Sequence, residues 1–134
     1  MQKAIAFFTF AALSLLASCT SCPLGHKTTA QGKVEHVVLI WLKKPGDAKD
    51  RAAVVAAAKK FQAEIPQIQH LSVGQPLPSD RPVVDDSFDV GMVIRFANQA
   101  DLSVYEKHPV HTQAVTDTLK PLAKKLLVYD VVTE

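Results

Sequence analysis

The residues best suited to chemistry lie in one short stretch, Tyr105-Glu-Lys-His108-Pro-Val-His111, which holds two of the chain's five histidines. An imidazole exchanges a proton near neutral pH, and a phenol donates a hydrogen bond. A neutral imidazole beside a bound carbonyl compound acts as a general base, while a phenol polarises the carbonyl group. The stretch therefore has the groups needed to enolise a carbonyl compound.

The spacing of this stretch predicts where its side chains point. Pro109 suits the first position of a helix, with His108 directly before it. His111 then occupies the third position and shares a helix face with residues three and four apart. Burial and the positive end of the helix dipole both disfavour a protonated ring, so we expect a lowered pKa for His111. The other members of its face are apolar: Val115, Leu119 and Leu122.

Two other interpretations of the stretch stay open. In a structural role, the histidine at the helix start bonds a backbone carbonyl, and Tyr105 is a core residue with its hydroxyl in water. In a metal site, His108 and His111 supply two ligands at a spacing of three. No cysteine, aspartate or glutamate clearly completes such a set. We therefore expect neither a metal nor a cofactor.

The hydrophobic pattern predicts the elements that must position these groups. Val34 to Leu42 is apolar on both faces, which is typical of a covered strand. The next helix is capped by Asp47 and carries an apolar stripe at helical spacing, formed by Val54, Ala58, Phe61 and Ile65. A third strand is expected to place Phe88, Val90, Met92, Ile94 and Phe96 on one face. The expected strands are 34–42, 68–77, 88–97 and 126–132, and the expected helices are 47–65, 98–108 and 109–125.

The order β-α-β-β-α-β predicts an α+β fold of the ferredoxin-like type, with helices on one face of a four-stranded antiparallel sheet. Helices on one face leave the other face uncovered. The first strand places Val37, Leu39 and Trp41 on that uncovered face. An exposed apolar face of this size indicates a homodimer.

Three segments resemble the stress-responsive dimeric α/β-barrel (Dabb) domain family. They are HVVLIWLKKPG in the first strand, IPQIQHLSVG after the first helix, and the Y-x-x-HPVH motif. The resemblance extends over residues 34–133, and we assign the domain to 34–134. It implies a ferredoxin-like fold whose sheets pack face to face into a dimeric α/β-barrel, in a stress-related homodimer.

A plant branch of this family has the same motif and closes a linear polyketide by aldol condensation. There, a tyrosine and a histidine of the motif act in a cavity between helices and sheet, and the resemblance carries these roles to Tyr105 and His111. The strand-one histidine corresponds to His36, and Val90 stands where the plant enzyme has another pocket histidine. We therefore expect His36, Tyr105 and His111 as catalytic groups, and Val90, Met92 and His108 as ligand contacts.

Two functions remain open at this point. One is a non-enzymatic homodimer that binds a small apolar ligand. The other is a cofactor-free enzyme of the polyketide-cyclase or isomerase type that acts on a carbonyl compound. A cavity bordered by the three expected catalytic residues favours the enzyme, and a filled space favours the binding protein.

The N-terminal segment predicts export and a lipid anchor. An apolar run ends in Leu16-Ala17-Ser18-Cys19, which resembles the bacterial lipobox. We expect a signal peptide over 1–18, lipidation of Cys19 and a flexible tether over 19–33, while an ordinary cleaved signal is the alternative. Thr20 resembles the residue after the cysteine in lipoproteins sorted to the outer membrane, so we expect attachment to its periplasmic face. The net charge of +2, without a basic stripe, predicts no nucleic-acid partner.

Overall fold

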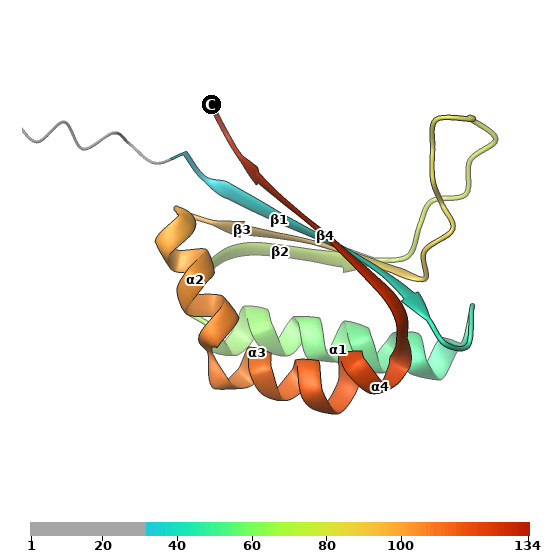
Figure 1. Ribbon diagram of the computed structural model, residues 1–134, viewed down its shortest axis with the longest axis horizontal. Coiled ribbons are helices and arrows are strands. Elements are labelled where there is room, and N and C mark those ends of the chain that lie inside the picture. The colour runs from blue at the N-terminus through green and yellow to red at the C-terminus, as the bar shows by residue number, and fades with distance from the viewer. Residues whose placement is uncertain (1–31) are drawn as a thin grey trace, which may run out of the picture.

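The computed structural model describes residues 32–134, and these form a four-stranded antiparallel sheet with all helices on one face (Figure 1). The strand order is β2-β3-β1-β4. The signal peptide, Cys19 and the tether up to residue 31 lie outside the described residues. The elements are β1 (Val34–Leu42), α1 (Ala48–Glu64), β2 (Ile68–Gly74), β3 (Val90–Phe96), α2 (Gln99–Lys107), α3 (Pro109–Ala114), the π-helical turn η1 (Val115–Leu119), α4 (Lys120–Leu122) and β4 (Ala123–Val132). The ferredoxin-like order is thereby confirmed.

The helices begin at the capping residues that the sequence predicted. Asp47 accepts a hydrogen bond from the Asp50 amide at the start of α1, and Asn98 accepts one from the Asp101 amide at the start of α2. Each bond satisfies an amide that has no partner inside the helix. Pro109 opens α3, which continues through η1 and α4. Within residues 32–134, no helix is both long enough and apolar enough to cross a membrane.

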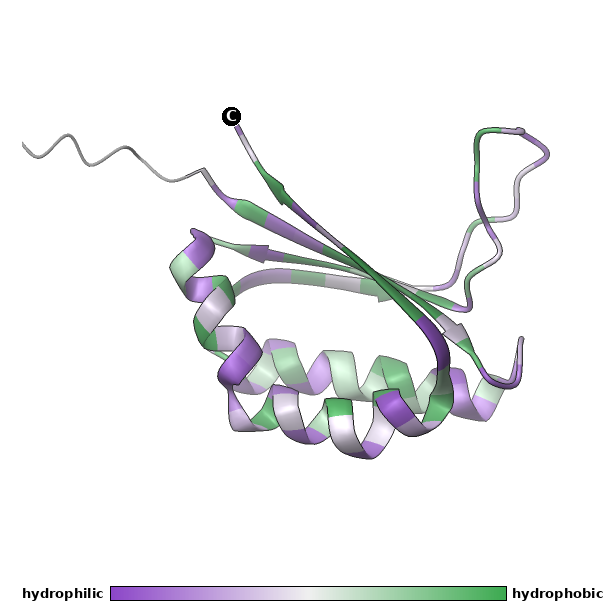
Figure 2. Cartoon of the chain, viewed as in Figure 1, coloured by the Kyte–Doolittle hydropathy of each residue, from purple (hydrophilic) through white to green (hydrophobic). Residues whose placement is uncertain are grey.

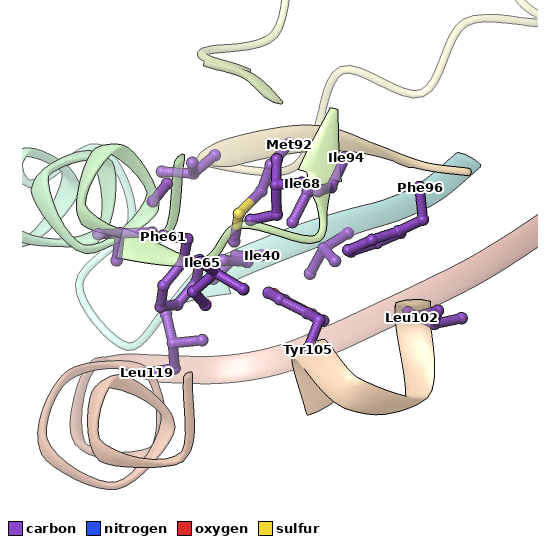
Figure 3. Close-up of a cluster of buried hydrophobic side chains, with 14 of the residues drawn as sticks. Ile40, Phe61, Ile65, Ile68, Met92, Ile94, Phe96, Leu102, Tyr105 and Leu119 are labelled. Carbon is purple, nitrogen blue, oxygen red and sulfur yellow. The ribbon is translucent and has the colours of Figure 1, made fainter. Parts of the chain in front are cut away.

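Strand β1 divides its side chains strictly between the two faces of the sheet. Its alternate residues from Val34 to Leu42 are buried beneath the helices, and the residues between them are half-buried on the opposite face. Figure 3 shows the resulting core, where Tyr105 of α2 packs among side chains from α1 and the strands. The predicted helical stripe of Val54, Ala58, Phe61 and Ile65 is buried in this core.

The opposite face of the sheet carries no helix and is mainly apolar. The ladder partners of Val37 are Val93 on β3 and Tyr129 on β4, and the β4 partner of Leu39 is Leu127. Trp41 lies on the same face, where the Lys125 ammonium is 4.1 Å from the centre of its ring. We call this surface, formed by Val37, Leu39, Trp41, Val93, Leu127, Tyr129 and Val131, the open face. Figure 2 shows hydrophobic stretches, interrupted by hydrophilic ones, along the strands that lie above the helices.

Strands β2 and β3 are shorter than the sequence predicted. β2 ends at Gly74 and not at residue 77, because Pro76 has no amide to donate to the ladder. β3 begins at Val90, and Phe88 does not join the buried face. The Phe88 ring instead packs edge-on against Trp41, with ring centres 6.3 Å apart.

Buried Asp89 explains the change of direction before β3. Its carboxylate accepts hydrogen bonds from the Leu42 amide, at 2.7 Å, and from the Gly46 amide, at 2.6 Å. The Leu42 amide therefore bonds a side-chain carboxylate and not a backbone carbonyl of β3. The alternation of buried and exposed residues along β3 begins at Val90 and does not extend back to Phe88. Gly91 leaves room for the displaced ring, because a Cβ atom there would lie 3.0 Å from Phe88.

The last helix is shorter, and the last strand longer, than predicted. Helix α4 ends at Leu122 and not near Lys125, and β4 begins at Ala123 and not at Leu126. The Leu122 carbonyl accepts a hydrogen bond from the Lys43 amide at the end of β1. Pairing with β1 therefore takes Ala123 and the two lysines after it into the sheet, against their preference for a helix.

Candidate functional site

A cavity of about 400 Å³ lies between the helices and the β1–β4 half of the sheet. Its walls are mainly apolar, and its polar groups come from four separate elements. Its side along β4 is open, because Leu126 and Val128 are each about half exposed. The cavity is lined by His36, Val38, Phe61, Met92, Tyr105, Glu106, His111, Val115, Leu119, Leu126, Val128 and Asp130.

His36 on β1 is held by a carboxylate on the neighbouring strand. The Nδ1 atom of His36 lies 2.6 Å from Oδ1 of Asp130, its ladder partner on β4. When the carboxylate is ionised it only accepts, so the Nδ1 of His36 carries the proton. In a neutral ring this leaves the lone pair on Nε2. Asp130 therefore fixes both the orientation and the tautomer of the buried imidazole.

His111 is held in the same way by a backbone group. Its Nδ1 atom lies 3.0 Å from the carbonyl oxygen of Glu106, so Nδ1 donates and Nε2 keeps the lone pair. Burial lowers the pKa of His111, the Glu106 carbonyl opposes that shift, and the positive charge of a protonated His36 would lower the pKa further. A neutral imidazole with a fixed tautomer can act as a general base when a substrate is bound beside it.

Tyr105 lies between the two histidines. Its ring centre is 4.4 Å from that of His111 and 5.7 Å from that of His36, and the residue is 2% exposed. Burial raises the pKa of its hydroxyl, so the hydroxyl stays protonated and remains a hydrogen-bond donor at neutral pH. Tyr105 lines the cavity together with the two histidines, so its hydroxyl is a candidate donor to a ligand bound there.

The structure thus brings together His36, Tyr105 and His111, and it places Met92 in the cavity wall. Val90 and His108, which were also expected as ligand contacts, do not line this cavity. Val90 is fully buried in the core, two residues along β3 from Met92. The ring of His108 turns back to the helix start, where its Nδ1 accepts a hydrogen bond from the Val110 amide at 3.3 Å. His108 is therefore a helix cap.

Asp130 and the Glu106 carbonyl were not found from the sequence. The hydrophobic pattern of β4 does not indicate which residue Asp130 contacts. Only the register of β1 against β4 places Asp130 beside His36. The Glu106 carbonyl lies five residues before His111, across the junction of α2 and α3. Within residues 32–134, no three histidine, cysteine or acidic side chains are grouped so that they could hold a metal ion.

The comparison with protein families identifies the domain. Residues 34–133 match the model of the stress responsive A/B barrel domain, Dabb. The chain belongs to this family. Among curated proteins the Dabb chain has no match.

Three solved structures place this Dabb domain among its relatives. A Dabb family protein of Mesorhizobium loti with a ferredoxin-like fold is 28% identical, with a TM-score of 0.64 over 78% of this chain and 99% of that one. A hydroxynitrile lyase from Passiflora edulis is 18% identical, with a TM-score of 0.67 over 78% and 95%. A dimeric ferredoxin-like protein of unknown function from Bacteroides fragilis is 21% identical, with a TM-score of 0.62 over 77% and 98%. At these lower identities the likeness concerns the fold.

Proposed function

We propose that this Dabb protein is an enzyme that moves a proton at the carbon next to a carbonyl group in a small, mainly apolar compound. One observation carries the proposal. His36, Tyr105 and His111 border a single cavity of about 400 Å³, which is of the size that small-molecule sites have. The cavity could instead have been filled by side chains, and then a purely structural role for the three residues would be favoured.

The three side chains divide the chemistry between them. His111, with its lowered pKa and its Nδ1 occupied, takes the proton on Nε2. Tyr105 donates its hydroxyl hydrogen to the carbonyl oxygen, where negative charge develops as the proton leaves. His36, oriented by Asp130, is a second imidazole whose Nε2 lone pair accepts a hydrogen bond from the substrate, while the protonated His111 returns the proton. The apolar walls lower the dielectric constant on the covered side of the cavity and so strengthen these interactions.

A likeness to one solved enzyme supports a carbonyl compound as the ligand. The Passiflora edulis structure is named as a hydroxynitrile lyase. A hydroxynitrile carries its hydroxyl and nitrile groups on one carbon, and loss of cyanide from it leaves a carbonyl compound. The same fold thus accommodates an enzyme whose product belongs to the compound class proposed here, although its reaction is a different one.

Isotope exchange tests the proposal without knowledge of the natural substrate. Simple ketones such as cyclohexanone and acetophenone are incubated with the full chain in D₂O, and loss of the proton signal next to the carbonyl is followed by NMR. We expect exchange faster than in buffer, and a loss of about 10²–10⁴-fold in His111→Ala and Tyr105→Phe. The control is Val104→Ala, an exposed residue of α2 outside the cavity.

A binding protein without catalysis is the second candidate, and the packing of Tyr105 favours it. The Tyr105 ring contacts those of Phe61 and Phe96, at 5.8 and 5.1 Å between centres, so the residue also serves the core. If a ketone shifts the His111 resonances while proton exchange stays at the buffer rate, the binding function is correct and the enzymatic proposal is wrong.

We further propose that the full chain is a homodimer joined through its open face and anchored by lipid on Cys19, at the periplasmic face of the outer membrane. The unpartnered apolar surface supports the dimer, and similar solved structures are described as dimeric. The lipobox-like residues before Cys19 support the anchor. A fatty-acid analogue should label wild type and the matched control Cys22→Ala but not Cys19→Ala, and equal labelling of all three would contradict the anchor.

A further inference from the structure

The loop between β2 and β3, residues 75–89, stands away from the sheet on the side opposite the helices (Figure 1). Within residues 32–134 it holds the two most exposed large apolar side chains, Leu77 at 84% and Val83 at 83%. Single exposed aliphatic residues are ordinary, but two of them on one projecting loop are an apolar contact surface. We call residues 75–89 the arm.

The arm is held in shape by its own hydrogen bonds. The Ser79 amide donates to the Asp86 carboxylate at 3.0 Å, which joins the two sides of the loop. At its base, the Trp41 indole donates to the Ser87 hydroxyl at 3.0 Å. Pro76, Pro78 and Pro82 restrict the backbone further. Leu77 and Val83 are therefore presented outward by a pre-organised loop, which lowers the entropy lost on docking.

Strand β4 has a second exposed apolar surface. It is an edge strand, with one side unpaired in the sheet order β2-β3-β1-β4. Its helix-side residues Leu126 and Val128 are 41% and 46% exposed, and they form the open rim of the cavity. Lys124 and Lys125 place charge at the start of this edge, whereas Leu126 and Val128 leave the following stretch apolar and open to another chain.

The charges of the arm argue against a membrane as its partner. Asp80, Asp85 and Asp86 surround the aliphatic pair, and Arg81 is the one basic residue of residues 75–89. This net negative charge opposes insertion into an anionic membrane surface. A second copy of the chain instead has an apolar β4 edge that the arm can contact. In a dimer with a two-fold axis, each arm contacts the β4 edge of the other copy.

We propose that the arm of each copy reaches past the edge of the other copy's sheet, so that Leu77 and Val83 cover Leu126 and Val128. Facing sheets pack about 10 Å apart, and the arm projects on the side where a sheet stacked on the open face would lie. The contact closes the open side of the cavity, so each site is complete only in the dimer. This inference rests on the proposed homodimer.

Photocrosslinking tests the contact directly. Benzoylphenylalanine replaces Leu77 in the full chain, purified in detergent, and crosslinked peptides are mapped by mass spectrometry with one copy isotopically labelled. We expect crosslinks between copies that map to the segment of Leu126 and Val128. The same probe at Val104, which is exposed on α2, serves as the control and should give none to that segment.

A stability measurement supplies the second readout. Leu77→Ser combined with Val83→Ser should raise the dimer dissociation constant about tenfold or more in sedimentation, since two aliphatic contacts are lost on each side. Val104→Ser should leave it unchanged. If the chain is a dimer but residue 77 does not crosslink to β4 of the other copy, or the dissociation constant stays the same, the arm contact is wrong while the dimer stands. A chain that is monomeric at all concentrations overturns both.

Discussion

The two faces of the sheet are built from the same strands, but helices of the chain cover only one of them. On β1, Val38 and Ile40 are buried beneath helices of their own chain, whereas Val37 and Leu39 remain half-buried on the open face. The covered face is completed by α1, α2 and α3–α4 and holds the cavity of about 400 Å³. The open face has a hollow of similar volume, about 380 Å³, whose lining within residues 32–134 includes Val37, Leu39 and Phe88 but no histidine or tyrosine. One face therefore specifies the fold and lines the candidate site, and the other is the surface through which we propose association.

The largest effect on the dimer dissociation constant is expected from a charged residue placed on the open face. Leu39→Asp should raise the dimer dissociation constant by at least about a hundredfold, because a buried unpaired carboxylate costs several kcal/mol. Trp41→Asp should do less, since the Lys125 ammonium already lies 4.1 Å from that ring and would pair with the new charge. Sedimentation equilibrium of each full-length variant measures the difference.

The control for these variants is Val104→Asp, which adds the same charge to an exposed position of α2. It should leave the dimer unchanged. If Leu39→Asp associates as tightly as wild type, the open face is not the interface, and the homodimer must use another surface.

Truncation of neighbouring residues on β1 gives the next largest effect. Ile40 is fully buried under the helices, so Ile40→Ala should destabilise the fold by about 2–5 kcal/mol and leave the dimer dissociation constant unchanged. Leu39→Ala should instead raise that constant, and its effect on unfolding should grow with protein concentration because dimerisation stabilises the folded state. Denaturant unfolding at several protein concentrations distinguishes the two. An identical response of both variants would contradict the division of the faces.

Both faces of β1 were predictable from the sequence, but the turn into β3 was not. The apolar residues on both sides of β1, with helices enough for one face only, predicted a covered and an open face, and the caps Asp47 and Asn98 predicted where two helices begin. The position of Phe88 was not predictable, because it depends on hydrogen bonds that Asp89 makes with amides more than 40 residues away. The periodicity of apolar residues predicts which residues share a face, but it does not predict polar contacts between residues far apart in the sequence.

The candidate site shows the same limit. A motif predicted Tyr105 and His111, and helical spacing predicted that His111 faces the core. The partner of His36 depends on the register of β1 against β4, which a β-branched, apolar strand does not specify by itself. Val90, which was expected as a ligand contact because it corresponds to a pocket histidine of the plant enzyme, does not line this cavity, although it shares a strand face with Met92.

The smallest effect is expected at His111, where the covered face meets the cavity. Its pKa is lowered from the ordinary value of 6.5, chiefly by burial, so the folded state binds a proton less readily than the unfolded state. As pH falls below about 6.5, the unfolded state gains the proton first and the fold loses stability. Above that pH the ring is neutral in both states and this contribution disappears.

His111→Ala removes that pH dependence. Because the side chain borders a cavity, the variant should lose less than about 1 kcal/mol near pH 7.5, whereas a histidine in a filled core would cost about 1–3 kcal/mol. Near pH 5.5 the loss should shrink or reverse, because the alanine variant no longer carries a group that resists protonation on folding. Histidine-resolved NMR titration and denaturant unfolding at the two pH values check both expectations. An ordinary pKa for His111, with equal losses at both pH values, would mean that the ring is solvated and that the cavity lacks its proposed base.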